Sequence, residues 1–199
     1  KKYMDELINY MNDSKLDINP LINTAIIHSQ FESIHPFDDG NGRVGRLLIS
    51  LCLYKFNVIK IPFFYISEAI SQNKIIYYNK LTDSRNNDYT EWIKFFLDMC
   101  VIQAEKHINY IDSLNKIYFK VCEKVKNIIN SQKYEEIIAC IFSQPIISST
   151  YLANTINVSL SQARKYLATL EKAQILEGDD RSRGRKYYFS ELLELLQKS

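Results

Sequence analysis

The sequence predicts a mainly α protein, with a helical first domain followed by a small α+β domain. Glycine and proline are scarce, at five and four of 199 residues, and apolar residues recur mostly at helical spacing. The pattern changes after about residue 130, where short helical segments are followed by two strand-like runs. We therefore expect one domain over residues 1–130 and a second over residues 131–199.

Local signals place the helices of the first domain. Asn19 is a good N-cap and Pro20 suits a first helical position. Asp88 and Glu91 have the spacing of a capping box. The helix after Gly42 is apolar nearly all round and should lie at the centre of the domain. The expected helices cover residues 2–12, 20–33, 42–56, 67–84 and 89–111, and the last of these or a successor continues to about residue 130.

The second domain is expected to be a winged helix. A helix over 134–142, two helices joined by a tight turn over 148–176, and two strands around a polar turn at Gly184 follow the order of that motif. Winged helices often bind DNA through their second helix. The basic and polar candidates are Ser161, Gln162, Arg164 and Lys165 on this helix and Arg181, Arg183, Arg185 and Lys186 on the wing.

Acidic residues nearly cancel the charge of that surface, so dimerisation or domain packing is an equal alternative for the winged helix. The whole chain has a formal net charge of +2, which by itself indicates neither nucleic acid nor membrane binding. No apolar run approaches the roughly 20 residues that span a bilayer. The four cysteines are far apart and lie among apolar residues, which favours a reducing, cytoplasmic environment.

The stretch HPFDDGNGRVGR, residues 35–46, is the strongest functional signal. Gly40, Asn41 and Gly42 allow successive N–H groups to point into one concavity at a helix start, a combination that suits phosphate. Arg43 and Arg46 lie three residues apart and extend the positive field along one helix face. These features indicate a site for more than one phosphate, although a Gly-Asn-Gly turn alone is usually only a turn.

Two further side chains of this stretch add chemistry to the phosphate site. Asp39 supplies a carboxylate, and Mg²⁺ in proteins is commonly held by one or two carboxylates together with phosphate oxygens. His35 can accept a proton near neutral pH. The set suits attack by a hydroxyl on a nucleotide phosphate. For His28 and His107 we expect structural roles.

The same stretch matches without a gap the Fic family signature, His-x-Phe-x-Asp/Glu-Gly-Asn-Gly-Arg-x-x-Arg. The resemblance extends over roughly residues 1–110 and includes PLINTAIIHSQFESI, RLLISLCLYKF and DYTEWIKFFL. It implies a Fic-type helical domain that transfers AMP from ATP to a Ser, Thr or Tyr hydroxyl of a target protein. Fic proteins followed by a winged helix are a familiar arrangement.

The resemblance also implies a role for each residue of the loop. His35 would be the general base, Asp39 would hold Mg²⁺, and Phe37 would be a core anchor. The phosphates of ATP would be bound by Gly40, Asn41, Gly42, Arg43 and Arg46. Tyr77 and Tyr78 fall where the family has a tyrosine pair near the adenine, although two aromatics on an ordinary helix face are an alternative.

Other functions stay open at this point. The chain could be a DNA-binding regulator whose Fic domain senses nucleotide or modifies itself, or an enzyme that removes AMP or transfers another phosphate-linked group. The β-hairpin flap and the inhibitory helix of many Fic proteins are not evident in these residues, and whether they exist upstream of Lys1 stays open. The expected partners are a target protein, DNA through the winged helix, and a second copy of the chain.

Overall fold

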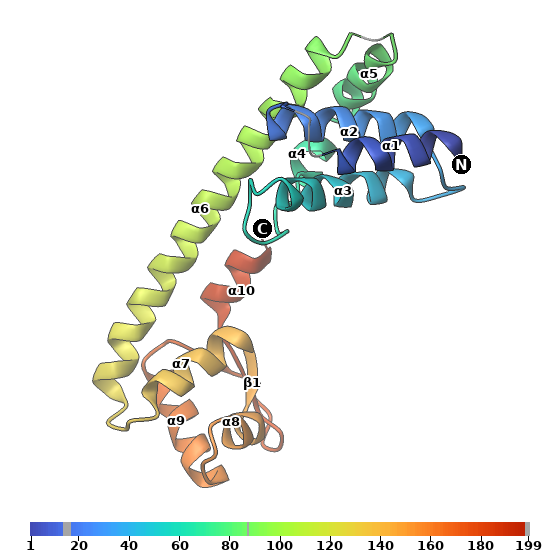
Figure 1. Ribbon diagram of the computed structural model, residues 1–199. Helices are drawn as coiled ribbons and strands as arrows, with labels where there is room; N and C mark the ends of the chain where they lie inside the picture. Colours follow the sequence, from blue (N-terminus) through green and yellow to red (C-terminus); the bar gives the residue numbers. More distant parts are fainter. Residues whose placement is uncertain (14–16, 87, 198–199) are drawn as a thin grey trace. The chain divides into compact units, whose positions relative to one another are not determined.

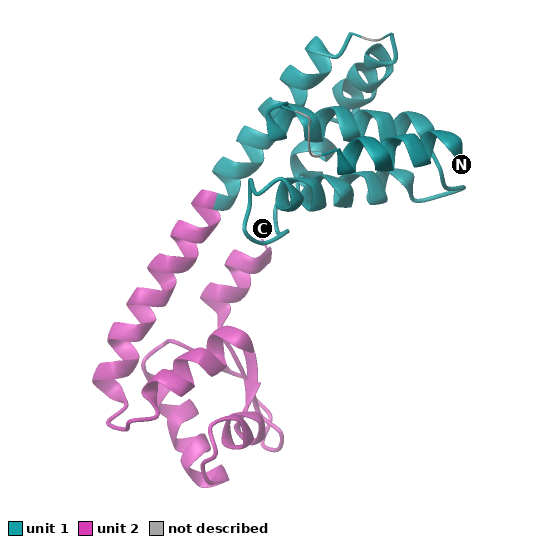
Figure 2. Cartoon of the chain, viewed as in Figure 1, with its two compact units in different colours: residues 1–107 teal, residues 108–199 magenta. Residues whose placement is uncertain are grey.

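The computed structural model describes residues 1–13, 17–86 and 88–197. The chain divides into two compact units, Lys1–His107 and Ile108–Ser199 (Figures 1 and 2). This division lies inside one long helix, α6 (Thr90–Ile128), and so falls earlier than the change of sequence pattern near residue 130. The assignment of functional domains to residues 1–130 and 131–199 stays a prediction.

Unit 1 is helical and is built around α2. Its helices are α1 (Lys2–Asn12), α2 (Pro20–Ile34), α3 (Asn41–Lys55), α4 (Ser67–Gln72), α5 (Lys74–Ser84) and the first part of α6. The side chain of Asn19 accepts a hydrogen bond from the N–H of Leu21, so the expected cap of α2 is present. α2 packs against both α1 and α3 (Figure 1), which brings the α2–α3 loop onto a rigid base.

One core cluster holds α2 to α6 together, and α1 packs through a separate cluster that contains Leu7, Ile27 and Phe31. Ala25 of α2, Ile49 and Leu53 of α3, and Trp92 and Phe96 of α6 are almost completely buried in the first of these clusters. The indole N–H of Trp92 donates to the carbonyl of Ala25 at 2.8 Å, which satisfies the polar edge of the largest core side chain. The expectation of a mainly α fold is confirmed.

Two local expectations for unit 1 were wrong. The helix expected over 67–84 is interrupted at Asn73, whose backbone is not helical and whose side chain donates to the carbonyl of Ala69 at 3.0 Å. The capping box is only half formed. Asp88 accepts from the N–H of Thr90 at 3.0 Å, but the carboxylate of Glu91 bonds to Lys80 and Lys94.

Unit 2 combines helices with a small sheet. After the end of α6 come α7 (Tyr134–Ser143), β1 (Ile146–Ser148), α8 (Ser149–Thr155), α9 (Leu160–Lys172), β2 (Glu177–Gly178), β3 (Lys186–Tyr188) and α10 (Ser190–Gln197). The strands form an antiparallel sheet in the order β1-β3-β2, in which Tyr188 pairs with both Ile146 and Glu177. β1 and α10 were not expected from the sequence.

The core of unit 2 includes the end of α6. Val121 and Val125 of that helix are buried with Ile141, Leu152 and Leu167. The last four turns of α6 therefore belong to the second hydrophobic core, which explains why the division into units precedes residue 130. Among the described residues, no helix is long and apolar enough to cross a membrane.

Candidate nucleotide site

The candidate base, His35, lies directly after the last residue of α2. Its backbone is left-handed (φ 49°, ψ 60°), and its N–H donates to the carbonyl of Phe31 at 3.0 Å, which closes the helix. The next residue, Pro36, disfavours a further helical turn. The side chain of His35 is exposed, so it can approach a substrate.

Asn41 fixes the shape of the loop that follows. Its side-chain oxygen accepts from the N–H of Phe37 at 2.9 Å, and its amide nitrogen donates to the carbonyl of Phe37 at 2.5 Å. The side chain is almost completely buried. Both of its polar atoms thus bond to the backbone four residues earlier, and the loop is clamped without a strand or a disulfide.

Helix α3 begins at the end of this loop. Gly40 is its N-cap and has φ 82°, a left-handed conformation in which glycine carries no steric cost. The N–H groups of Arg43 and Val44 both bond to the carbonyl of Gly40 at 3.0 Å. Helix geometry leaves the N–H groups of Asn41 and Gly42 without an intrahelical acceptor, and the positive end of the helix dipole lies there.

The acidic and basic side chains of the loop are mostly exposed. One guanidinium nitrogen of Arg43 lies 3.8 Å from a carboxylate oxygen of Asp39, whose other oxygen accepts from the N–H of Gly40 at 2.6 Å. Arg46 donates from Nε to the hydroxyl of Ser67, at the start of α4, at 3.2 Å. Asp38 and Asp39 balance the formal charge of the two arginines, but a weak, exposed ion pair and a neutral hydroxyl leave both guanidinium groups accessible to an anion.

Glu32 and Gly45 belong to the site although the sequence did not single them out. A Cβ at Gly45 would force the carboxylate of Glu32 to move and would press on His28 and Phe31, so glycine favours the close packing of α3 on α2. One carboxylate oxygen of Glu32 is buried without a hydrogen bond. Burial raises the pKa of Glu32, against the opposing effect of the positive charges of His35 and Arg46.

His28 is a structural residue beneath the site, as expected. Its Nδ1 lies 3.0 Å from the carbonyl of Gly45, and its Nε2 lies 2.9 Å from the hydroxyl of Tyr77. A carbonyl can only accept, so Nδ1 carries the proton and Nε2 accepts from Tyr77. Complete burial lowers the pKa of His28 to about 4, which keeps the ring neutral at pH 7. His28 thereby ties α2, α3 and α5 together.

The two tyrosines of α5 have different surroundings. Tyr77 is buried at 3% exposure, packs against Trp92 and Phe95, and uses its hydroxyl on His28. Tyr78 is exposed, with the ammonium group of Lys74 5.9 Å from its ring centroid. Tyr77 is a core residue, and of the pair only Tyr78 has a ring that is exposed to solvent.

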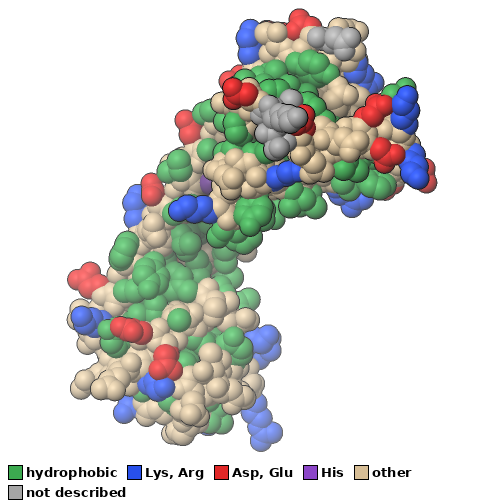
Figure 3. Space-filling model, in the orientation of Figure 1, with side chains coloured by type: hydrophobic (Ala, Val, Ile, Leu, Met, Phe, Trp, Pro, Cys, Tyr) green, Lys and Arg blue, Asp and Glu red, His purple; other side chains and the backbone are tan. Residues whose placement is uncertain are grey.

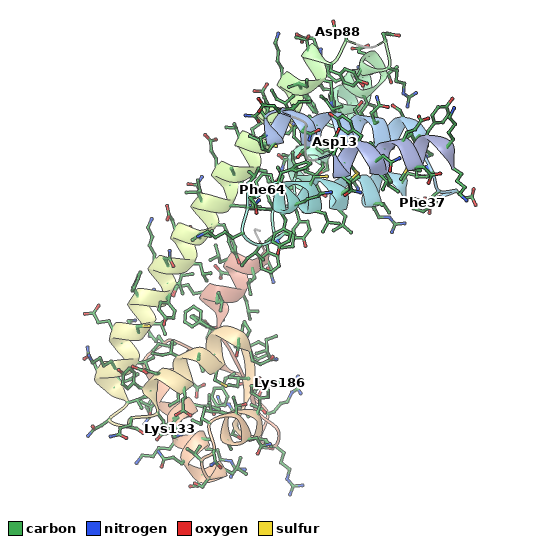
Figure 4. All side chains as sticks on the ribbon, in the orientation of Figure 1. Asp13, Phe37, Phe64, Asp88, Lys133 and Lys186 are labelled. Carbon is green, nitrogen blue, oxygen red and sulfur yellow. The ribbon has the colours of Figure 1, made fainter. Side chains whose placement is uncertain are left out.

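Phe37 is not the core anchor that the resemblance implied. Its side chain is half exposed, and its ring centroid lies 6.3 Å from that of Phe31. Figure 4 shows Phe37 in the loop between α2 and α3, at one end of unit 1. The loop is anchored by the side chain of Asn41, which bonds to the backbone of Phe37 and not to its ring.

The loop thus gathers an exposed imidazole, a carboxylate, a helix start and two arginines within residues 35–46. In the part of the chain that the structure describes, no three His, Cys, Asp or Glu side chains form a ready metal site. A cation here would need ligands from a bound molecule in addition to Asp39. The arrangement suits a ligand that carries its own oxygens, such as a polyphosphate.

Comparisons with known proteins agree with this chemistry. Residues 1–53 match the model of the Fic/DOC family. A probable protein adenylyltransferase of Aquifex aeolicus is 30% identical over 124 residues, which are 58% of this chain and 38% of that protein. The protein adenylyltransferase fic-1 of Caenorhabditis elegans is 40% identical over 53 residues, 26% of this chain and 10% of that protein. The chain spans less than half the length of these relatives.

A solved structure is similar over most of the chain. The crystal structure of a Fic family protein from Desulfovibrio desulfuricans G20 matches with a TM-score of 0.51 and 22% identity, covering 94% of this chain and 54% of that one. At this identity the likeness establishes the fold alone. The match to the Fic/DOC family covers residues 1–53 and so includes the whole of the loop at residues 35–46.

Proposed function

We propose that this chain is part of a protein adenylyltransferase that transfers AMP from ATP to a Ser, Thr or Tyr hydroxyl of a target protein. The observation that carries the proposal is the placement of exposed His35 on the same clamped loop as the start of α3 and its two arginines. The names of the relatives from Aquifex aeolicus and Caenorhabditis elegans support it.

In the proposed reaction, His35 accepts the proton of the target hydroxyl as its oxygen attacks the α-phosphorus of ATP. The new bond joins this oxygen to AMP, and the bond to the bridging oxygen breaks, so pyrophosphate leaves with the electron pair. The arginines and the first amides of α3 stabilise the negative charge that develops. Arg43 would bind the β-phosphate and Arg46 the γ-phosphate.

The remaining loop residues hold the nucleotide and its cation. Asp39 fits a Mg²⁺ site because it is an exposed carboxylate beside the phosphate cradle, and Mg²⁺ would neutralise phosphate charge. Gly40, Asn41 and Gly42 would contact the α-phosphate region. In the structure the side chain of Asn41 is bonded to Phe37, so we assign Asn41 a backbone contact and a positioning role. Tyr78 is our candidate for the adenine.

The test is incubation of the chain with Mg²⁺, ATP labelled on the α-phosphate, and a cell lysate as the source of targets. We expect label on protein, with a mass increase of one AMP, that is lost in His35→Ala. His35→Asn is a second variant, because Asn tolerates the left-handed backbone of this position better than Ala. Both should still bind ATP, since the base acts on the target. Label that persists in both variants would refute the assignment of His35.

A second candidate function is DNA binding by unit 2, read as a winged helix. Arg164 and Lys165 are exposed on α9, and Lys186 points outward in Figure 4. The proposal predicts binding to duplex DNA that weakens steeply with salt and is lost in the double variant R164A/K165A. DNA binding that is unchanged in this variant would exclude α9 as the helix that contacts DNA. We place the protein in the cytoplasm, where its four free cysteines would stay reduced.

A further inference from the structure

Unit 1 carries an exposed apolar surface that the nucleotide site does not use. Helix α3 presents Leu47, Leu51 and Tyr54 to solvent, each about half exposed. The segment after the helix adds Val58, Ile61, Phe63 and Tyr65, with exposed fractions between 43% and 70%. We call these seven residues the α3 patch. Figure 3 shows hydrophobic side chains at the surface of this unit.

The local fold explains why these side chains share one surface. Residues 61–66 alternate, with Ile61, Phe63 and Tyr65 exposed and Phe64 and Ile66 turned toward the core. The hydroxyl of Ser50 donates to the carbonyl of Phe64 and so ties this segment beside the middle of α3. Leu47, Leu51 and Tyr54 flank Ser50 on the helix. The inward residues complete the core, and the outward ones remain without a partner in unit 1.

The size of the α3 patch matches one side of a stable protein interface. Seven large side chains that are each about half exposed offer on the order of 800 Å², which is about what one partner contributes to an interface of standard size. Three of the seven are aromatic, and none is charged. Interface centres are enriched in aromatic residues and depleted of charge. Isolated exposed apolar residues are normal, but a cluster of this size marks an interaction surface.

The spacing on α3 favours a second copy of the same chain as the occupant. Val44, Leu47, Leu51 and Tyr54 follow one another at intervals of three, four and three residues, the a/d spacing by which helices pair along a shallow crossing. A two-fold axis beside the helix would place Leu47 of one copy against Leu51 of the other. The two helices would then be antiparallel, so that their dipoles attract.

We propose that this chain forms a two-fold symmetric dimer through the α3 patch, with α3 of each copy at the centre and Phe63 and Tyr65 at its flank. A two-fold interface uses the same surface on both copies, and the seven side chains of the α3 patch carry no charge that would repel its own copy. The proposal is independent of the proposed enzymatic function, and its test does not use activity.

The test is sedimentation analysis of the full chain over about a hundredfold range of concentration. We expect a concentration-dependent dimer for the unchanged chain. The variants Leu51→Lys and Phe63→Lys should each weaken it by more than about tenfold, because a charge would be buried at the centre. Ile75→Lys is the matched control, since Ile75 of α5 is 79% exposed and lies outside the α3 patch.

Circular dichroism and thermal unfolding should show that all three variants fold like the unchanged chain, because each replaced side chain is exposed. A second measurement uses the double variant L47C/L51C, which should cross-link two copies under mild oxidation if Leu47 of one α3 lies against Leu51 of the other. A chain that stays monomeric throughout the concentration range would overturn the proposal. So would a dimer that Leu51→Lys and Phe63→Lys leave as strong as Ile75→Lys does.

Discussion

Two loops of this chain combine arginine with glycine, but they use their arginines differently. In the loop between α2 and α3, Arg43 is 3.8 Å from an exposed carboxylate and Arg46 bonds to a neutral hydroxyl. In the turn between β2 and β3, Arg185 donates to the carboxylate of Glu171 and to the carbonyl of Asp179, both at 2.8 Å, and lies over the ring of Tyr187.

The difference shows that the number of arginines does not identify an anion site. Two bonds and an aromatic face hold the guanidinium of Arg185 within the fold of unit 2. A phosphate would have to displace Glu171 before it could bind there. Arg46 has no carboxylate to displace at the distance of an ion pair among the described residues. The loops differ in whether a carboxylate and a carbonyl lie close enough to bond to the guanidinium group.

The largest contrast is expected from replacing one arginine in each loop. Arg46→Ala should weaken ATP binding by about 10- to 100-fold, since a charged hydrogen bond contributes about 1.5–3 kcal/mol. Arg185→Ala should leave ATP binding unchanged and lower the free energy of unfolding by about 1 kcal/mol, because its ion pair is partly exposed. Calorimetric titration and urea unfolding of both variants measure the two effects. Equal loss of ATP affinity in the two variants would show that Arg46 and Arg185 do not differ in their access to phosphate.

The next largest effect, on the free energy of unfolding, is expected from replacing Gly45 of α3 and Gly184 of the β2–β3 turn. Gly45→Ala should destabilise the protein by about 1–3 kcal/mol, because the new methyl would push α3 away from His28 and Phe31. Gly184→Ala has open space around its Cβ, and its cost should be limited to the left-handed backbone at φ 66°. Urea unfolding of both variants tests this order. A Gly45→Ala variant as stable as the unchanged chain would mean that the helices can separate freely.

The pH dependence of the free energy of unfolding tests the packing under the first loop, where His28 lies. Its pKa is about 4 in the folded protein and about 6.5 in an unfolded chain, so the unfolded state binds more protons between these values. Stability should therefore fall as the pH drops below about 6.5, by about 1.4 kcal/mol per pH unit. Urea unfolding at pH 7, 6 and 5 should show a smaller slope for His28→Gln.

Glu32 titrates against this trend, since its raised pKa favours the folded state as the pH falls. The variant Glu32→Gln removes that contribution and should make the fall in stability below pH 6.5 steeper. A slope that is the same in the unchanged chain and in His28→Gln would show that His28 is not held neutral.

The smallest effect is expected from the exposed ion pair of the first loop. Asp39→Asn should leave the melting temperature unchanged, because the side chains of Asp39 and Arg43 are 96% and 78% exposed and such a pair contributes almost nothing. The same variant should reduce the Mg²⁺ dependence of ATP binding if the proposed cation site is correct. A clear drop in melting temperature would show that the pair supports the loop.

Sequence patterns predicted what depends on neighbours in the chain. The cap at Asn19 and the loop of residues 35–46 both follow from short-range geometry, and the loop residues lie together because they are consecutive. The break at Asn73 was missed because its side-chain bond to Ala69 competes with a helix that is otherwise well patterned. β1 has three residues, which is too short for a periodic signal.

The supporting part of the site could not be read from the sequence. Tyr77 is 49 residues from His28, and its hydroxyl is buried only because α5 packs against α2. Glu32 was an ordinary helical residue until the structure showed α3 passing over its carboxylate at Gly45. A glycine inside an expected helix was the available signal, because glycine weakens a helix unless another backbone or side chain must come close.

Helix α6 has a consequence for how the chain exchanges its amide hydrogens with solvent. Residues 104–116, all of them described, include no buried side chain, whereas Trp92 and Val125 on either side belong to separate cores. Residues 108–113, in the middle of this stretch, pack against neither core, and helical turns without such support are marginally stable in water. Local opening should therefore occur within these middle turns at a lower free energy than at the ends, and deuterium should enter the centre of α6 first.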